Sequence, residues 1–168
     1  MSYALKEGKS RWAEKTPSYS FILPFINSLF PNCQIIHIIR DGGDVVASHR
    51  DRWGYWSAIK ATRKWQITIE TIRNYASNLP SNRYYEIKYE ELVQNPENTL
   101  KELFQYLEEP WESNLLEEGP YENELTKSRR QLDSQKSVFY TVRIGEGSRS
   151  LDPLLRILLY FQSRSLIK

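Results

Sequence analysis

Short apolar segments alternate along this chain with longer stretches in which apolar residues recur every three or four positions. Residues 34–40 read Gln-Ile-Ile-His-Ile-Ile-Arg, a nearly continuous β-branched run that is typical of a parallel strand buried on both faces. Residues 83–89 form a second strand candidate. Strands that alternate with helical segments predict an α/β domain with a parallel sheet flanked by helices.

Apolar stripes and helix-start residues predict four helices, and a fifth follows from a capping residue. The stripes are Phe21, Ile22, Phe25, Ile26 and Leu29 after Pro17; Ala58, Ala61, Trp65, Ile69, Ile72 and Ala76 within residues 56–79; Leu100, Leu103, Phe104 and Leu107 after Pro96; and Leu154, Leu155, Leu158, Leu159 and Phe161 after Pro153. Asp44 is predicted to cap a helix that begins at Val45. Residues 110–150 are rich in polar groups and are expected to be irregular.

Composition narrows the class of protein. A chain of 168 residues with 40% hydrophobic residues is expected to form one globular domain over residues 1–168. Its longest apolar runs are too short to cross a bilayer, and its first residues contain no hydrophobic signal core. One cysteine fits a reducing compartment, so we expect a cytoplasmic protein. With two histidines besides that cysteine, no metal site is expected.

Charge is unevenly distributed although the net charge is only +2. Residues 86–124 carry twelve acids against two lysines, whereas residues 127–168 carry nine Lys or Arg against three acids. A basic tail suits an anionic partner, and a solvated surface explains the same pattern. No nucleic-acid partner is expected.

Arg40 stands at the carboxyl end of the first predicted strand, where open α/β sheets bind ligands. A guanidinium is always charged and grips phosphate through paired hydrogen bonds. Ser48 lies eight residues further on, within the next predicted helix, where its hydroxyl could add to a phosphate cradle. The alternative from spacing alone is an ion pair of Arg40 with Asp41 or Asp44 and an exposed Ser48.

Two further segments carry candidate chemistry. Glu14 and Lys15 precede a helix start, where a carboxylate could accept a proton and an ammonium could neutralise a leaving group. Residues 134–149 are basic, hydroxyl-rich and contain two glycines, a composition that suits a loop folded over a phosphate. The alternative for Glu14 and Lys15 is a pair of solvated surface residues, and the alternative for residues 134–149 is a surface loop.

Several motifs together resemble the sulfotransferases that use 3′-phosphoadenosine 5′-phosphosulfate (PAPS), and most closely the protein-tyrosine sulfotransferase branch. Residues 29–48 resemble that family's 3′-phosphate motif, with "LFP" before the strand and an Arg-Asp pair followed by a serine. Residues 89–96 resemble its "YE-x-LV-x-x-P" segment, and residues 109–111 read Glu-Pro-Trp. The similarity runs from about residue 12 to about residue 152, and four motifs in the right order make it specific.

The resemblance implies a P-loop-NTPase-like sulfotransferase fold and a role for each matching position. The implied nucleotide-binding residues are Arg40, Ser48, Tyr89, Arg143, Gly145 and Arg149, and the implied catalytic residues are Glu14, Lys15 and Ser134. Glu14 matches a base of the glycan-modifying branch only, and Tyr89 could instead anchor the end of its strand. The family transfers a sulfuryl group from PAPS to a hydroxyl of a peptide, a glycan or a small molecule, without a metal.

One part of the family pattern has no counterpart here. The family's first strand ends in a loop of the type "P-[KR]-[ST]-G-[ST]-[ST]", which holds the 5′-phosphosulfate, and residues 6–10 offer only a Gly-Lys-Ser fragment without a preceding strand. We therefore expect a chain that lacks the first strand and its loop. This leaves two hypotheses, an active sulfotransferase and an inactive remnant that keeps the 3′-phosphoadenosine half-site. A P-loop kinase relative would need a Walker loop, which is not visible.

Overall fold

The computed structural model describes residues 2–116 and 144–163. Its elements are α1 (Ser2–Lys6), η1 (Pro17–Phe21), α2 (Leu23–Leu29), β1 (Ile35–Ile39), α3 (Gly42–Trp53), α4 (Tyr55–Ala76), η2 (Ser81–Arg83), β2 (Tyr84–Lys88), α5 (Tyr89–Gln94), α6 (Pro96–Tyr106), η3 (Ser113–Leu116), α8 (Glu146–Ser150) and α9 (Pro153–Ser163). In this part of the chain, none of the helices combines the length and the apolar character that crossing a bilayer requires.

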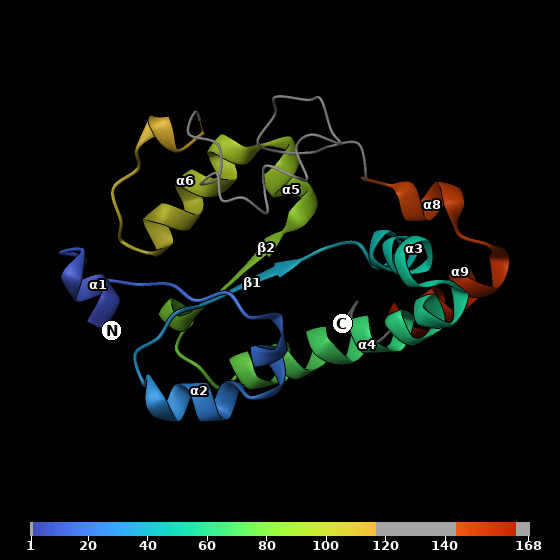
Figure 1. Cartoon of the computed structure of the whole chain (residues 1–168), viewed down its shortest axis with the longest axis horizontal. Coiled ribbons are helices and arrows are strands. Elements are labelled where there is room, and N and C mark those ends of the chain that lie inside the picture. The colour runs from blue at the N-terminus through green and yellow to red at the C-terminus, as the bar shows by residue number, and fades with distance from the viewer. Residues whose placement is uncertain (1, 117–143, 164–168) are drawn as a thin grey trace.

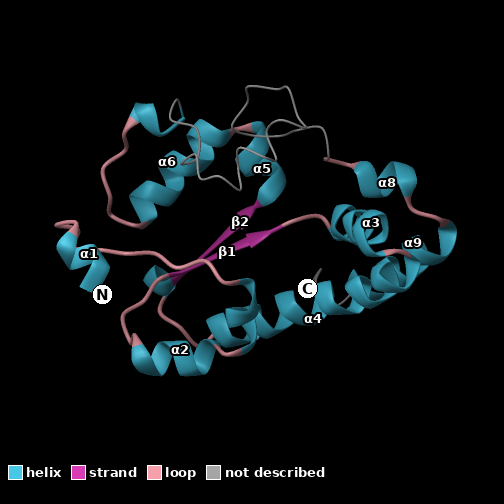
Figure 2. Cartoon of the chain, viewed as in Figure 1, coloured by secondary structure: helices cyan, strands magenta, loops and turns pink. Residues whose placement is uncertain are grey.

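The two predicted strands form a parallel pair at the centre of the molecule. Ile35 lies opposite Tyr84, and Ile39 lies opposite Lys88. In Figure 1, α2 and α4 lie on one side of the pair and α5 and α6 on the other, while α3, α8 and α9 gather beyond the carboxyl end of β1. Figure 2 shows how much of the chain is helical around this small sheet. The α/β class, with a parallel sheet flanked by helices, is therefore confirmed.

The main apolar core lies where α3, α4 and α9 meet, beside the carboxyl end of β1. It consists of Val46, Ala47, Ala58, Ala61, Leu151 and Leu155, with Ile59 and Leu159 packed against it. Three of these residues are alanines, and small side chains let helices approach closely. Helix α9 therefore joins the C-terminal segment to the helix that follows β1.

Three local predictions are wrong. Helix α3 begins at Gly42 rather than Val45, because Asp41 is the capping residue and its Oδ1 accepts the backbone N–H of Asp44 at 3.0 Å. Strand β1 is not buried on both faces, since Ile38 is 52% exposed. Tyr89 begins α5 rather than ending a strand.

The first predicted apolar stripe also has a different environment from the one expected. The segment splits into η1 and α2 around Ile22, and Phe21, Phe25 and Leu29 are each about half exposed. Leu23 is the residue of α2 that is buried. The split changes the rotational phase of the helix, so the stripe read across the break does not form one buried face.

Candidate site at the carboxyl end of the sheet

Arg40 directly follows β1, and its guanidinium lies 5.0 Å from the centre of the Tyr89 ring. The register explains this contact, because Ile39 pairs with Lys88 and the next residues of both strands emerge side by side. A cation over an aromatic ring is stabilised by the electron-rich face of the ring. The Arg40 side chain is 24% exposed, so ligands can reach part of it.

The turn after Arg40 packs tightly against Trp65. A Cβ added to Gly42 would lie 3.1 Å from the Trp65 ring, and the indole N–H of Trp65 donates to the Arg40 carbonyl at 3.0 Å. The Asp41 N–H donates to Glu90 Oε1 at 2.9 Å. These contacts fix the backbone between β1 and the N-terminus of α3, where N–H groups favour anionic ligands.

Asp44 connects this turn to the C-terminal segment. Its side chain is fully buried, and its carboxylate accepts the N–H of Gly145 at 3.0 Å and the N–H of Gly147 at 2.8 Å. Arg40 Nη2 lies 3.6 Å from Asp44 Oδ2. We call Arg40, Asp44, Tyr89, Gly145 and Gly147 the strand-end cluster.

Three carboxylates lie near Arg40, and each of them accepts a backbone N–H. Asp44 accepts two, while Asp41 accepts that of Asp44 and Glu90 accepts that of Asp41. Each N–H group carries a partial positive charge, which offsets part of the negative charge of the carboxylate that accepts its hydrogen bond. Arg40 remains 24% exposed beside these carboxylates.

The structure brings some of the predicted nucleotide-binding residues together. Gly145 caps α8 with a φ of 76°, a left-handed conformation that favours glycine. Ser48 is half-buried in α3, one turn beyond Asp44, and Arg149 is exposed in α8. Arg143 lies outside the described residues.

The predicted catalytic residues come from other segments of the chain. Glu14 and Lys15 are both exposed in the extended segment before η1, where Glu14 Oε1 accepts the Thr16 hydroxyl at 2.6 Å. No described hydrogen bond or ion pair joins either side chain to Arg40. Ser134 lies outside the described residues. Within the described part of the chain, no group of three or more His, Cys, Asp or Glu residues is placed to hold a metal ion.

The sequence predicted Asp44 only as a helix cap or as an ion-pair partner of Arg40. Its ion pair with Arg40 is present, but its bonds to Gly145 and Gly147 span about a hundred residues. The two glycines in residues 134–149 were the one available signal, and they indicated a loop over a phosphate rather than a contact with α3.

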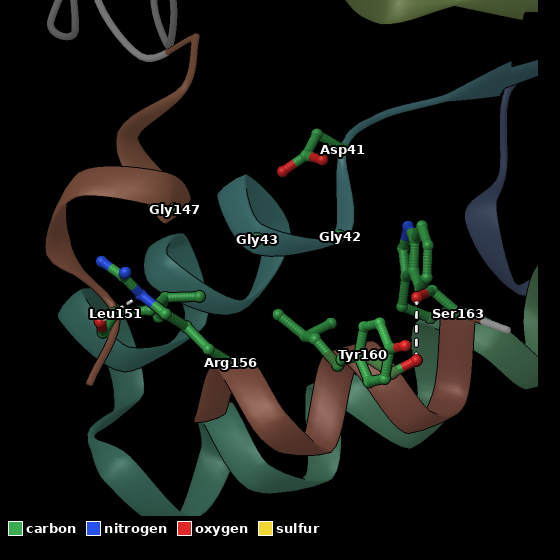
Figure 3. Close-up of a pocket in the computed structure, with 10 residues that line it drawn as sticks. Asp41, Gly42, Gly43, Gly147, Leu151, Arg156, Tyr160 and Ser163 are labelled. Carbon is green, nitrogen blue, oxygen red and sulfur yellow. Dashed lines mark hydrogen bonds between the residues drawn. The ribbon is translucent and has the colours of Figure 1, made fainter. Parts of the chain in front are cut away.

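A cavity of about 350 Å³ opens beside the turn at residues 41–43. Figure 3 shows Tyr160 and Arg156 of α9 on one side of it and Asp41 on the other. Arg156 donates from Nε to the Leu151 carbonyl at 2.9 Å, which holds it along the wall. The cavity places an aromatic and a cationic side chain next to the N-terminus of α3, and no pattern in the sequence had indicated it.

A parallel strand pair with an arginine and a helix N-terminus at its carboxyl end is the arrangement in which open α/β sheets bind ligands. Comparisons with known proteins specify the family. The sulfotransferase family profile matches residues 2–113. The chain therefore belongs to the sulfotransferase family.

Relatives and solved structures agree with this assignment. The chain is 25% identical over 138 residues to a protein-tyrosine sulfotransferase of Drosophila melanogaster, covering 76% of this chain and 28% of the relative. It is 24% identical over 112 residues to protein-tyrosine sulfotransferase A of Caenorhabditis elegans, covering 63% of this chain and 30% of that protein. The chain thus spans less than a third of the length of these relatives.

Two solved sulfotransferase domains share the fold. The domain of the Synechococcus PCC 7002 olefin synthase superimposes with a TM-score of 0.78 at 21% identity, over 99% of this chain and 62% of that domain. The domain from the curacin biosynthetic pathway gives a TM-score of 0.71 at 22% identity, over 91% of this chain and 61% of that domain. The predicted sulfotransferase fold is confirmed.

Proposed function

We propose that this chain forms the 3′-phosphate side of a site that transfers a sulfuryl group from PAPS to an acceptor hydroxyl. The observation that carries the proposal is Arg40, which follows β1, stacks over Tyr89 and lies beside the N-terminus of α3. A partly exposed guanidinium next to helix N–H groups suits a phosphate dianion. The family assignment supplies the nucleotide that would bring that phosphate.

The reaction would be an in-line displacement at sulfur. The acceptor oxygen forms a bond to sulfur while the bond between sulfur and the bridging oxygen of the 5′-phosphate breaks, and 3′-phosphoadenosine 5′-phosphate leaves. The acceptor proton passes to a base, for which Glu14 is the candidate, and Lys15 and Ser134 would stabilise the transferring and leaving groups. Arg40, Ser48, Tyr89, Arg143, Gly145 and Arg149 would hold the nucleotide.

A binding module that retains only the half-site is the second candidate function. The sequence favours it, because residues 6–10 offer only a Gly-Lys-Ser fragment in place of the family's loop for the 5′-phosphosulfate. Such a module would bind the nucleotide through Arg40 without transferring the sulfuryl group.

A hydroxyl on a protein is the acceptor class that we propose first, because two relatives are named protein-tyrosine sulfotransferases. A glycan hydroxyl and a small alcohol are the other acceptors to assay. A panel of a tyrosine peptide, a glycan and a small alcohol, each offered with radiolabelled PAPS, would distinguish them by which product carries the label.

Calorimetry with 3′-phosphoadenosine 5′-phosphate tests the nucleotide site directly. We expect binding by the native chain and a loss of about tenfold to a hundredfold in affinity for Arg40→Ala, because a charge-assisted contact to phosphate is removed. Arg63→Ala is the matched control, since Arg63 is an exposed arginine of α4 outside the cluster. Equal affinities for the native chain and Arg40→Ala would refute the assignment of Arg40.

The transfer assay separates the two candidate functions. Label on an acceptor, lost in Lys15→Ala, supports the enzyme. Nucleotide binding that depends on Arg40 but gives no labelled product from any acceptor supports the binding module and rejects catalysis by this chain.

A further inference from the structure

The Asp44 carboxylate is fully buried between α3 and the C-terminal segment. Oδ1 accepts the N–H of Gly147, and Oδ2 accepts the N–H of Gly145 and faces Arg40. Two backbone N–H groups two residues apart thus point at one side chain. A buried carboxylate is stabilised by such charge-assisted bonds, which are stronger than bonds between neutral groups.

Two more contacts seat the same segment on the same helix. The backbones of Gly43 and Gly147 touch, so a Cβ added at position 147 would overlap the main chain of Gly43. Six residues beyond Asp44 in α3, Arg50 Nη1 donates to the Ser150 carbonyl at 2.5 Å. Helix α3 therefore holds residues 145–150 at both ends of α8, and these residues lie beyond the part of the chain that the family profile matches.

We propose that Asp44 is the positioning residue that seats residues 145–150 beside Arg40, so that nucleotide affinity depends on Asp44 although it would not touch the nucleotide. The proposal rests on the proposed function, because it concerns the same phosphate site. Arg40 and the backbone of Gly145 share one carboxylate oxygen, so the position of the arginine and that of the segment bearing Arg149 are set together.

Electrostatics alone predicts the opposite change in nucleotide affinity when the Asp44 carboxylate is removed. A carboxylate 3.6 Å from Arg40 offsets the positive charge that a phosphate needs, so its removal should strengthen binding of an anion. A seating role predicts weaker binding on removal, because Gly145, Gly147 and Arg149 lose their placement. The sign of the change in affinity therefore separates the two roles of Asp44.

Asp44→Asn is the main test, with affinity for 3′-phosphoadenosine 5′-phosphate measured by calorimetry on the full chain. The amide retains the shape but offers one acceptor oxygen, and its NH₂ group would face an N–H donor. We expect affinity to fall at least about tenfold. Glu91→Gln is the matched charge control, because Glu91 is an exposed carboxylate of α5 near the same end of the sheet. It should change affinity by no more than about twofold.

Gly147→Ala tests the seating without a change of charge, because the added methyl group must push the segment away from Gly43. It should also weaken nucleotide binding. Amide hydrogen exchange gives a second readout in the absence of nucleotide. Both variants should exchange faster at residues 145–150 than the native chain, while β1 and β2 remain as protected as before.

The outcomes separate the inference from the proposed function. Asp44→Asn that binds the nucleotide as tightly as the native chain, or more tightly, overturns the positioning role. A native chain that binds no nucleotide refutes the proposed function, and exchange still decides the seating. In that case unchanged exchange at residues 145–150 in both variants would also refute the seating by Asp44.

Discussion

Strand β1 and its neighbours carry two hydrogen-bonded groups, each built around an arginine and a carboxylate, with different surroundings. The first, which we call the sheet network, consists of His37, Tyr84, Glu86 and Arg73. The second is the strand-end cluster around Arg40 and Asp44. His37 and Arg40 are only three residues apart in the sequence, yet the first group lies on the sheet and α4, whereas the second reaches across to the C-terminal segment.

Hydrogen bonds join all four members of the sheet network. Arg73 donates to Glu86 at 2.9 and 2.6 Å, and the Tyr84 hydroxyl donates to Glu86 Oε2 at 2.8 Å. Because the single hydroxyl proton of Tyr84 is used there, His37 Nδ1 must donate to the Tyr84 oxygen, 2.8 Å away. The bonds from Arg73 lower the pKa of Glu86, and burial raises that of Tyr84.

The strand-end cluster differs because its arginine lies where the strand stops. Beyond residue 39 the backbone leaves the sheet and enters α3, while β2 runs directly into α5. Buried, bonded charge is therefore not by itself the reason to propose a binding site. Arg40 differs from Arg73 because it lies at the carboxyl end of a parallel strand, next to helix N–H groups, and this position is why we propose Arg40 for the nucleotide site.

The stability of the strand-end cluster should depend most on the apolar core where α3, α4 and α9 meet. Leu155 is fully buried between α3, α4 and α9, so Leu155→Ala should lower the free energy of unfolding by about 3 kcal/mol through lost burial and a cavity. Urea denaturation measures this change. Leu154→Ala is the control, because Leu154 is 51% exposed and its loss should cost less than about 0.5 kcal/mol. Equal effects of the two variants would contradict the placement of α9.

Breaking the sheet network should reduce stability while leaving the nucleotide site in place. Glu86→Ala leaves Arg73 and Tyr84 without their shared acceptor, and we expect a loss of about 2 kcal/mol in unfolding free energy. Nucleotide affinity of the folded protein should remain within about twofold of native. A tenfold loss of affinity would show that the two groups are coupled and would remove the distinction drawn between them.

Tyr84→Phe removes one hydroxyl from the middle of the sheet network. It should cost about 1 kcal/mol, because His37 loses its acceptor while Glu86 keeps both bonds from Arg73. The same substitution in a Glu86→Ala background should cost less, since the hydroxyl has already lost its acceptor there. Additive effects in the double variant would argue that Tyr84 and Glu86 act independently.

Most of the fold could be predicted from periodicity. Both strands and the helices now described as α4, α6 and α9 lie close to their predicted positions, because each has a long or strongly apolar pattern. The start of α3 could not be predicted from the sequence, because the local propensity of Gly42 and Gly43 indicates a turn. The cap from Asp41 overrides that propensity, and close packing against the Trp65 ring favours a small residue at position 42.

The candidate site could be predicted where one segment contains the signal and not where two segments meet. Arg40 follows from a strand and the residue that ends it. The bonds from Asp44 to Gly145 and Gly147 could not be predicted, because no local pattern joins positions about a hundred residues apart. The six-residue α5 was missed because Tyr89 continues the alternating character of β2, although it already belongs to the helix.

The smallest expected effect is a pH dependence that arises in the sheet network. Burial lowers the pKa of His37 below its ordinary value of 6.5, outweighing the opposite influence of Glu86, whose Oε2 lies 3.9 Å from Nδ1. The unfolded chain therefore binds a proton at a higher pH than the folded chain, so the stability from His37 is complete above pH 6.5 and declines as the pH falls below it. Glu86, whose pKa is also lowered, adds a further loss only below the ordinary pKa of a glutamate.

His37→Gln tests this origin, because a glutamine can still donate to Tyr84 but does not titrate. Unfolding free energies measured between pH 7.5 and 5.5 should decline less steeply in this variant than in the native chain. The pKa of His49 in α3 is also lowered, chiefly by burial, so His49→Gln shows how much of the decline comes from the other histidine. A native-like decline in His37→Gln would place the proton uptake outside the sheet network, and His37 would then not be the buried neutral group that contrasts with the charged strand-end cluster.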